Sequence, residues 1–501
     1  MHIRKFALEI IVFVSGAVVM ILELTGMRIL APYAGTSAVV WTSLIGVILG
    51  FLSIGYSFGG KLADRIQSFK KLGDILLLSA ALVVLINLLR PFGLFFSQNL
   101  FSDVRLGSVF LAIFLFGPAS FALGMIPTYC VRLKIKVLKT SGATVGRLYA
   151  LSTLGSILGT FLGGFVLIST FGNRNIIYLL SLILGFASAI SYSLDLKKRF
   201  IFPALLVFLL VSLNFTDFSW YKDKKVILDT DSQYSRIIVA QMQQPGSEKS
   251  ILALFTGRLF YQAGGYQSAI YLEDPSVLAA KYLQFFLLAE YFTPKIERAL
   301  LMGGGAYVFP RYFLTKNPSS SIDIVELDPK ITQIAKDNFF LKEDPRIRIY
   351  PQDGRTYLNK NTKKYDAVYL DAFNDLVLPF HLTTLEATNL IFNSLDEDGV
   401  LVVNIISALN GSSGKVFRAI YTTYKSVFPN VYVFPVTYPG NTNKIQNIVL
   451  IATKEKINLT KGEKKDEYSK YLNNLLEIEI GPRTPILTDD FAPLDYYYLL
   501  M

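Results

Sequence analysis

The chain has 501 residues, 52% of them hydrophobic, and a formal net charge of +11. Its mean hydropathy of +0.42 is too high for an ordinary water-soluble enzyme. No stretch interleaves aromatic and basic side chains, so we expect no nucleic-acid partner. The single cysteine, Cys130, excludes an intrachain disulfide and a cysteine metal cluster, and we predict no metal site.

The apolar excess lies before about residue 216, which predicts a membrane domain over residues 1–216 with about seven transmembrane helices. A membrane-spanning helix needs about 20 apolar residues. Runs of that length lie near 6–27, 38–60, 73–96, 107–130, 147–171 and 174–193, and a shorter run follows at 201–216. The last run either crosses the bilayer or forms a tilted or interfacial helix, and both alternatives stay open.

Basic clusters follow alternate apolar runs, beginning with Arg4-Lys5 and ending with Lys197-Lys198-Arg199. Loops rich in lysine and arginine stay in the cytoplasm, so we predict a cytoplasmic N-terminus. The side on which the polar C-terminal part lies depends on whether 201–216 crosses, and the sequence leaves it open.

The C-terminal part predicts an α/β architecture. Short strand-like runs at 226–228, 236–240 and 251–255 predict a small β-strand lobe over 217–265. A helical run at 275–291 follows. Strands then recur at helix-sized intervals over 266–501, which predicts a Rossmann-like, mostly parallel sheet. The predicted strands are 299–302, 322–326, 347–350, 366–371 and 399–406.

A glycine run follows the first strand of this sheet. Gly303, Gly304 and Gly305 let the backbone approach a nucleotide without a side-chain clash. Glu326 ends the second strand. Its separation in sequence from the glycines is close to the value of about 20 residues that is typical of a nucleotide-binding βαβ unit. Such a carboxylate accepts hydrogen bonds from both ribose hydroxyls, so we predict a nucleoside site.

Further carboxylates follow the strands on either side. Asp328 comes after the second strand, Asp353 with Gly354 after the third, and Asp371 after the fourth. The carboxyl ends of parallel strands meet at one edge of a sheet, where ligands bind. Several acids in one crevice favour a cationic ligand such as a sulfonium or an ammonium ion.

Together these residues resemble the spermidine synthases, the polyamine aminopropyltransferases, and the resemblance implies that the sheet is of the S-adenosylmethionine methyltransferase type. The resemblance covers nearly the whole chain, because the apolar part is similar to the multi-pass bacterial variants fused to a transporter-like domain. The motifs in the C-terminal part are Asp231 to Tyr234, Thr256-Gly257-Arg258, the glycine run, Val325 to Asp328, Asp353-Gly354-Arg355, Tyr369 to Asp371 and Leu487 to Pro493. Those in the apolar part are Arg28 to Tyr33, Gly59 to Arg65 and Gly146 to Tyr149.

The resemblance implies transfer of an aminopropyl group from decarboxylated S-adenosylmethionine, as a co-substrate, to an amine such as putrescine, with no permanently bound cofactor. Glu326 would then bind the ribose hydroxyls, Asp353 the adenine amino group, and Asp371 would take the proton from the attacking amine. Gly303 to Gly305, Asp328 and Gly354 complete the predicted nucleoside site. Tyr234, Asp375, His381 and Asp490 are the predicted substrate-binding residues.

The chain also departs from the family pattern. Ala306 stands where the family has an acid that contacts the donor's amino end, and Ser235 replaces the glutamine of a tyrosine-glutamine pair. The family's Tyr-His-Glu run, which holds the polyamine, corresponds to Lys281 through Gln284 and lacks the histidine and the glutamate. An acceptor other than putrescine is therefore an open alternative.

Two other functions fit the same residues less well. One is an S-adenosylmethionine-dependent methyltransferase, because a fold does not determine its chemistry. The other is a polyamine transporter or sensor with a non-catalytic ligand-binding domain. We expect a multi-pass protein of a bacterial cell membrane whose partners are the lipid bilayer and a small amine, with a homodimer as an open alternative.

Overall fold

The computed structural model describes residues 2–34, 38–101, 103–135, 141–195, 225–257, 265–293, 295–373, 378–456, 465–478 and 484–501. It forms two compact units, one helical and one α/β, that divide near residue 222. Residues 230–236 group with the helical unit. The two units are described separately below.

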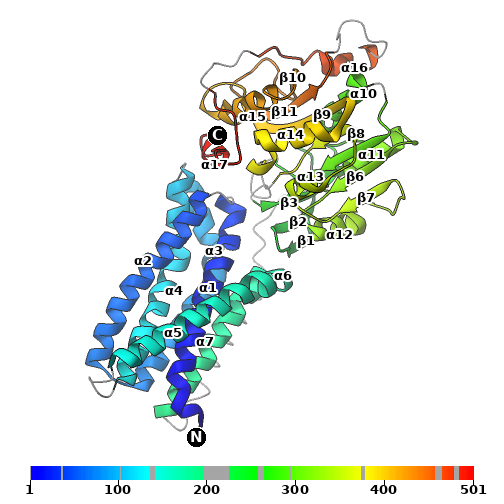
Figure 1. The fold of residues 1–501 in the computed structure, drawn as a ribbon. Helices are drawn as coiled ribbons and strands as arrows, with labels where there is room; N and C mark the ends of the chain where they lie inside the picture. Colours follow the sequence, from blue (N-terminus) through cyan, green and yellow to red (C-terminus); the bar gives the residue numbers. More distant parts are fainter. Residues whose placement is uncertain are drawn as a thin grey trace. The chain divides into compact units, whose positions relative to one another are not determined.

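The helical unit consists of long helices that follow the apolar runs (Figure 1). In chain order these are α1 (His2–Ala34), α2 (Ala38–Arg65), α3 (Phe69–Leu100), α4 (Val104–Lys134), α5 (Ser141–Phe161), the π-helical turn η2 (Leu162–Leu167), α6 (Ile168–Thr170) and α7 (Asn173–Asp195).

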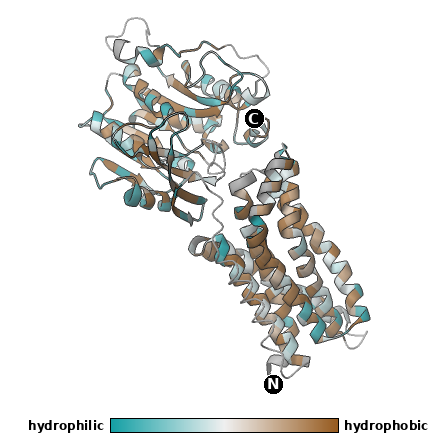
Figure 2. Ribbon diagram, turned by 180° about the vertical axis from the view of Figure 1, so that it is seen from behind, coloured by the Kyte–Doolittle hydropathy of each residue, from teal (hydrophilic) through white to brown (hydrophobic). Residues whose placement is uncertain are grey.

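Six of the described helical segments are long and apolar enough to cross a membrane, and they coincide with six of the apolar runs in the sequence. They are Phe6–Ala31, Val39–Arg65, Phe69–Arg90, Arg105–Lys134, Ser141–Leu167 and Asn173–Leu194. Hydrophobic residues run along these helices (Figure 2). Large apolar side chains also point outward, including Phe165 (75% exposed) and Phe186 (71% exposed), as expected of a surface that faces lipid. The predicted segment 201–216 lies outside the described residues.

Glycines let pairs of these helices pack closely. A Cβ atom on Gly155 of α5 would lie 1.9 Å from the carbonyl oxygen of Phe13 on α1, and one on Gly59 of α2 would lie 2.6 Å from the Cα atom of Met125 on α4. Near the end of α2, Asp64 also forms an ion pair with Arg132 of α4 at 2.7 Å. The Gly59 to Arg65 pattern therefore joins α2 to α4.

The α/β unit contains two sheets. The first is a four-stranded sheet in the order β1-β2-β3-β4, in which β2, β3 and β4 pair antiparallel. Its strands are β1 (Lys225–Asp231), β2 (Arg236–Gln243), β3 (Ser250–Thr256) and β4 (Ser268–Tyr271). Three of them coincide with the strand-like runs in the sequence.

The second sheet has seven strands in the order β10-β11-β9-β8-β5-β6-β7. Strands β5 to β9 pair parallel, and β10 and β11 add an antiparallel edge. The mostly parallel sheet is confirmed, while β10 and β11 were not predicted. The strands are β5 (Arg298–Met302), β6 (Ser321–Val325), β7 (Ile347–Tyr350), β8 (Tyr365–Leu370), β9 (Leu395–Ser407), β10 (Asn430–Pro435) and β11 (Gln446–Thr453).

Helices cover both faces of this sheet. One apolar cluster joins the strands to α9 (Lys281–Phe285), α11 (Val308–Lys316) and α12 (Pro329–Asn338). The other joins them to α13 (Gly354–Lys360), α14 (Leu385–Ser394), α15 (Lys415–Lys425) and α17 (Leu494–Tyr498). The remaining helices are η4 (Phe286–Leu288), α10 (Ala289–Phe292), η5 (Phe380–Leu382), η6 (Ser412–Gly414) and α16 (Lys465–Leu472).

The predicted helix at 275–291 was too long at its N-terminal end. The helix begins at Lys281, because Leu278 forms a β-bridge with Ile270 of β4 and cannot join the helix. This extended segment brings Tyr282, in the first turn of α9, close to the carboxyl end of β8.

Candidate active site

The glycine turn after β5 requires its glycines. Gly303 has φ +95° and Gly305 has φ +51°, values that favour glycine strongly. A Cβ atom on Gly303 would lie 2.3 Å from the carbonyl oxygen of Asp371. The turn therefore packs directly against the end of β8, and any side chain at Gly303 would separate the two strand ends.

Glu326 holds the same turn in place. Its Oε2 atom accepts a hydrogen bond from the Gly304 N–H at 2.8 Å, and its Oε1 atom accepts one from the Asp328 N–H at 2.9 Å. Burial raises the pKa of Glu326 although these backbone donors lower it. Each carboxylate oxygen can accept a second hydrogen bond, so the buried carboxylate can still receive ribose hydroxyls.

Asp328 lies beside Glu326 and begins α12. Its Oδ1 atom accepts a hydrogen bond from the Lys330 N–H at 3.0 Å, the usual contact of an N-terminal capping residue. The residue is buried, and among the described residues nothing donates a hydrogen bond to its Oδ2 atom. A buried acceptor without a donor is costly, and a ligand hydroxyl in the crevice would satisfy it.

Asp353 caps α13 and contacts His381. Its Oδ1 atom accepts from the Thr356 N–H at 2.9 Å, and its Oδ2 atom lies 3.0 Å from Nε2 of His381. Burial acts to raise the pKa of Asp353, but the Thr356 N–H and His381 outweigh it and leave the pKa below its usual value. Asp353 is therefore an ionised acceptor that suits an amino group of a ligand.

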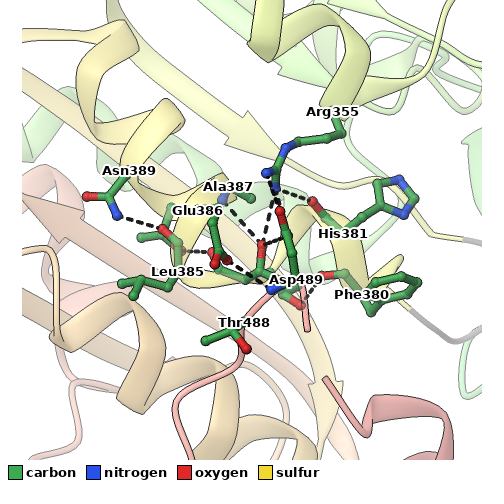
Figure 3. A network of polar contacts seen from close by, with 12 residues as sticks. Arg355, Phe380, His381, Leu385, Glu386, Ala387, Asn389, Thr488 and Asp489 are labelled. Carbon is green, nitrogen blue, oxygen red and sulfur yellow. Dashed lines mark hydrogen bonds and ion pairs between the residues drawn. The ribbon is translucent and has the colours of Figure 1, made fainter. Parts of the chain in front are cut away.

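The loop that carries His381 is anchored by a polar network (Figure 3). Arg355 of α13 donates to the carbonyl oxygen of His381 and forms an ion pair with Asp489 at 2.7 Å. Thr384 donates to the same Asp489 carboxylate at 2.7 Å, and Glu386 accepts from the Asp489 N–H at 3.0 Å. In Figure 3 the imidazole ring of His381 points away from Arg355, and it is this ring that reaches Asp353.

Asp371 lies at the end of β8, directly against the glycine turn. Its Oδ2 atom accepts a hydrogen bond from the hydroxyl of Tyr282 at 2.9 Å, and its Oδ1 atom accepts one from Nδ2 of Asn404 at 3.0 Å. Burial raises the pKa of Asp371 to about 7, while the two hydrogen bonds act in the opposite direction. A carboxylate with this pKa is a stronger base than an exposed aspartate and is suited to accept a proton near neutral pH.

A pocket of about 380 Å³ lies beside Asp371. Tyr282 and Asn404, which hold the Asp371 carboxylate, both line it. Its other lining residues come from the ends of β2 and β11, from the segment before β4 and from the start of α9. Asp371 therefore stands between the glycine turn and a cavity large enough for a small ligand.

The structure brings together most of the predicted nucleoside residues. Strands β8, β5, β6 and β7 are neighbours in the sheet, so Asp371, the glycine turn, Glu326 and Asp353 follow adjacent strand ends. Gly354 begins α13 next to Asp353, with no room for a large side chain beside Leu382.

The predicted substrate-binding residues are dispersed. His381 contacts Asp353, at the end of the crevice furthest from β8 in strand order. Tyr234 and Asp490 are exposed, and neither is among the residues that line the pocket. Asp375 lies outside the described residues. Substrate binding by these four residues stays a prediction.

Sequence reasoning missed Tyr282 and Asn404. Tyr282 falls within the Lys281 to Gln284 run, which lacks the histidine and the glutamate of the family pattern. Asn404 is a polar residue inside the apolar strand β9, and it is 2% exposed. A buried amide in such a strand requires hydrogen-bond partners, and this signal could have identified it.

The fold and these side chains define a class of enzyme. A glycine turn, buried carboxylates that accept from hydroxyl or amino groups, and a basic aspartate beside a pocket describe a nucleoside-dependent transferase built on a methyltransferase-like sheet.

Comparison with known proteins agrees with this class. Residues 287–461 match the spermine/spermidine synthase domain. A polyamine aminopropyltransferase of Vibrio vulnificus is 29% identical over 226 residues, which is 42% of this chain and 73% of that protein. Polyamine aminopropyltransferase 2 of Aquifex aeolicus is 22% identical over 495 residues, which is 93% of this chain and 91% of that protein. The crystal structure of a probable spermidine synthase from Corynebacterium glutamicum has a TM-score of 0.41 at 20% identity and covers 49% of this chain and 86% of that one.

The chain carries a spermine/spermidine synthase domain at residues 287–461, which makes it a transferase similar to the polyamine aminopropyltransferases. The match to the Aquifex aeolicus protein extends over the helical unit as well.

Proposed function

We propose that this protein is a membrane-bound polyamine aminopropyltransferase that moves the aminopropyl group of decarboxylated S-adenosylmethionine onto an amine. The observation that carries this proposal is Asp371, a basic carboxylate between the glycine turn and the pocket. Putrescine is the acceptor that the family resemblance implies, and it serves as the reference amine.

The nucleoside end of the donor fits the crevice. Glu326 and the free Oδ2 atom of Asp328 would accept the ribose hydroxyls, and Asp353 would accept from the adenine amino group. The acids of the crevice would also attract the positive sulfonium. In this arrangement the sulfonium lies near the glycine turn, next to Asp371.

Asp371 would then serve the attacking amine. An alkylamine is mostly protonated near neutral pH, by analogy with the lysine pKa of about 10.4. The carboxylate orients the amine and takes its proton, and the nitrogen lone pair forms a bond to the methylene carbon of the aminopropyl group that is attached to sulfur. The C–S bond breaks, and the electron pair stays on sulfur, which leaves as a neutral thioether.

The helices α1 to α5 and α7 would hold the enzyme in a bilayer, with the N-terminus on the cytoplasmic side. Protease accessibility in sealed vesicles tests that orientation. A homodimer is a further prediction, which the mass of the purified protein in detergent tests.

The activity is tested on the full chain purified in detergent. We expect a product heavier than the amine by one aminopropyl group when the protein is incubated with decarboxylated S-adenosylmethionine and an amine, detected by mass spectrometry. A methylated product with S-adenosylmethionine, or amine uptake into vesicles without any product, would overturn the proposal.

A further inference from the structure

The lining of the pocket beside Asp371 is poor in negative charge. Its polar side chains are mostly amides, and they come from β2, the segment before β4, β9 and β11. These side chains are Gln244, Gln267, Asn404, Gln446 and Asn447. Lys281, which is exposed, is the one charged residue among the described lining residues. Asp371 is the one carboxylate that contacts a lining side chain in the described part of the chain.

Four of these five amide oxygens already accept a hydrogen bond in the described part of the chain. Oε1 of Gln446 accepts from the N–H groups of Thr437 at 3.0 Å and Tyr438 at 2.7 Å, which uses both of its lone pairs. Oε1 of Gln244 accepts from the hydroxyl of Tyr271 at 2.9 Å.

The same holds on the other walls of the pocket. Oδ1 of Asn404 accepts from Nδ2 of Asn447 at 3.0 Å, and Oε1 of Gln267 accepts from the hydroxyl of Thr256 at 3.1 Å. Four of the five amide nitrogens likewise donate one hydrogen bond, so each of these nitrogens keeps a second hydrogen for a ligand. Each amide nitrogen carries two hydrogens, and Nε2 of Gln267 has no acceptor among the residues that the structure describes.

The charge of this lining suits a neutral or anionic group better than a cation. Among the residues that the structure describes, an ammonium at the far end of the pocket would meet the positive charge of Lys281, and the one carboxylate in contact with the lining is Asp371, at the reacting end. A hydroxyl, carbonyl or carboxylate would instead receive those N–H groups, and a carboxylate would also be attracted to Lys281.

We propose that the amine acceptor of this enzyme carries a neutral or anionic hydrogen-bond acceptor at its far end, as an amino alcohol or an amino acid does, and not a second ammonium. The inference rests on the proposed aminopropyl transfer, since it concerns the amine that this site alkylates. The amine nitrogen lies at Asp371, and the far end of the acceptor meets the free N–H donors of the amides near Lys281.

Three acceptors with the same four-carbon chain test this directly: putrescine, aminobutanol and γ-aminobutyrate. The full chain in detergent is given decarboxylated S-adenosylmethionine with each amine, and kcat/KM is measured from the product masses. We expect aminobutanol or γ-aminobutyrate to exceed putrescine by about 10-fold or more, because the second ammonium of putrescine is left without a partner.

Placing a carboxylate in the pocket should reverse this preference. Gln267→Glu keeps the size of the side chain and adds one negative charge, so we expect kcat/KM for putrescine to rise and that for γ-aminobutyrate to fall, each by about 10-fold. The matched control is Gln243→Glu, which adds the same charge at an exposed position of β2 outside the lining, and it should leave the ratio unchanged.

A second variant removes the positive charge instead. Lys281→Met should lower kcat/KM for γ-aminobutyrate by about 10-fold and leave that for aminobutanol nearly unchanged. Binding of the donor nucleoside reports whether Gln267→Glu is folded. If that variant does not fold, Lys281→Met still tests the pocket.

The outcomes separate this inference from the proposed function. Product from putrescine at a higher kcat/KM than from the other two amines overturns the inference and leaves the aminopropyl transfer intact. A ratio unchanged by both Gln267→Glu and Lys281→Met, in variants that bind the donor, also overturns it. Absence of product from every amine overturns the proposed function itself.

Discussion

The two sides of Asp371 are built in different ways. On the nucleoside side, the carboxylates of Glu326, Asp328 and Asp353 accept from backbone N–H groups at turns and helix starts. On the pocket side, side chains bind side chains: Tyr282 and Asn404 hold Asp371, and Asn447 holds Asn404. Backbone contacts depend on local chain geometry, whereas side-chain contacts depend on residues distant in sequence.

This difference has a functional consequence. The backbone hydrogen bonds that hold these carboxylates change little when neighbouring side chains change. The nucleoside side therefore suits one constant donor. A pocket lined by amide side chains can be altered by single substitutions, so its selectivity for the acceptor can change without a change in the nucleoside side. Asp371 belongs to both sides, and substitutions around it should separate the two.

The largest effect is expected from Asp371→Asn. The amide cannot take the proton of the attacking amine, so kcat should fall by about 10²–10⁴-fold. Binding of the donor, measured by titration calorimetry, should fall by much less than kcat, because the predicted contacts to the ribose and the adenine are made by Glu326, Asp328 and Asp353. Asp398→Asn removes a carboxylate from an exposed position of β9 and serves as the control. Turnover retained in Asp371→Asn would show that Asp371 is not the base.

Glu326→Gln should act mainly on the donor. The neutral amide weakens the predicted charge-assisted hydrogen bonds to the ribose hydroxyls, each of about 1.5–3 kcal/mol. One of the two backbone N–H groups that donate to Glu326 would also face an amide N–H. We expect the dissociation constant of the donor to rise by about 10–100-fold, while kcat at saturating donor changes less.

The control for this variant is Glu343→Gln, at an exposed glutamate outside the crevice. Donor affinity unchanged in Glu326→Gln would remove Glu326 from the nucleoside site.

Tyr282→Phe should shift the pH dependence. The rate should rise with pH through about 7 as the Asp371 carboxyl ionises, because only the ionised form accepts a proton. The Tyr282 hydroxyl stabilises that ionised form and lowers the pKa of Asp371. Its removal raises this pKa, so the ascending limb of the kcat/KM profile should move to higher pH and the rate at pH 7 should fall several-fold.

Tyr312→Phe removes a hydroxyl from a partly buried tyrosine of α11 and should leave the profile in place. An unshifted limb in Tyr282→Phe would mean that the profile reports a group other than Asp371.

The sequence was sufficient for the parts of the molecule that local patterns determine. Six apolar spans, five parallel strands and the glycine turn followed from periodicity and spacing, because each depends on residues close in the chain. The pairing of Asn404 with Asp371 could not be foreseen in this way. It requires β9 to lie beside β8 in register, with Leu370 opposite Val403, and it joins residues 33 positions apart.

The antiparallel strands β10 and β11 were missed for a similar reason. β11 pairs with β9, and β10 pairs with β11. The chain reverses between β10 and β11, where Oε1 of Gln446 accepts a hydrogen bond from the Tyr438 N–H. The same fold-back carries Gln446 and Asn447 into the pocket. The part of the site that escaped prediction is therefore the part that depends on long-range strand pairing.

The smallest effect is expected from substitution of His381. The result shows whether this residue acts on the nucleoside side or on the pocket side of Asp371. The sequence predicted a substrate-binding role, whereas the imidazole ring lies 3.0 Å from Asp353. If it acts there, His381→Ala should raise the pKa of Asp353, because His381 now helps to lower it, and should weaken donor binding by less than about 10-fold. His381→Gln, which can still donate a hydrogen bond, should restore part of that affinity.

The KM for the amine should stay constant in both variants. A rise in the KM for the amine with unchanged donor affinity would instead place His381 on the acceptor side.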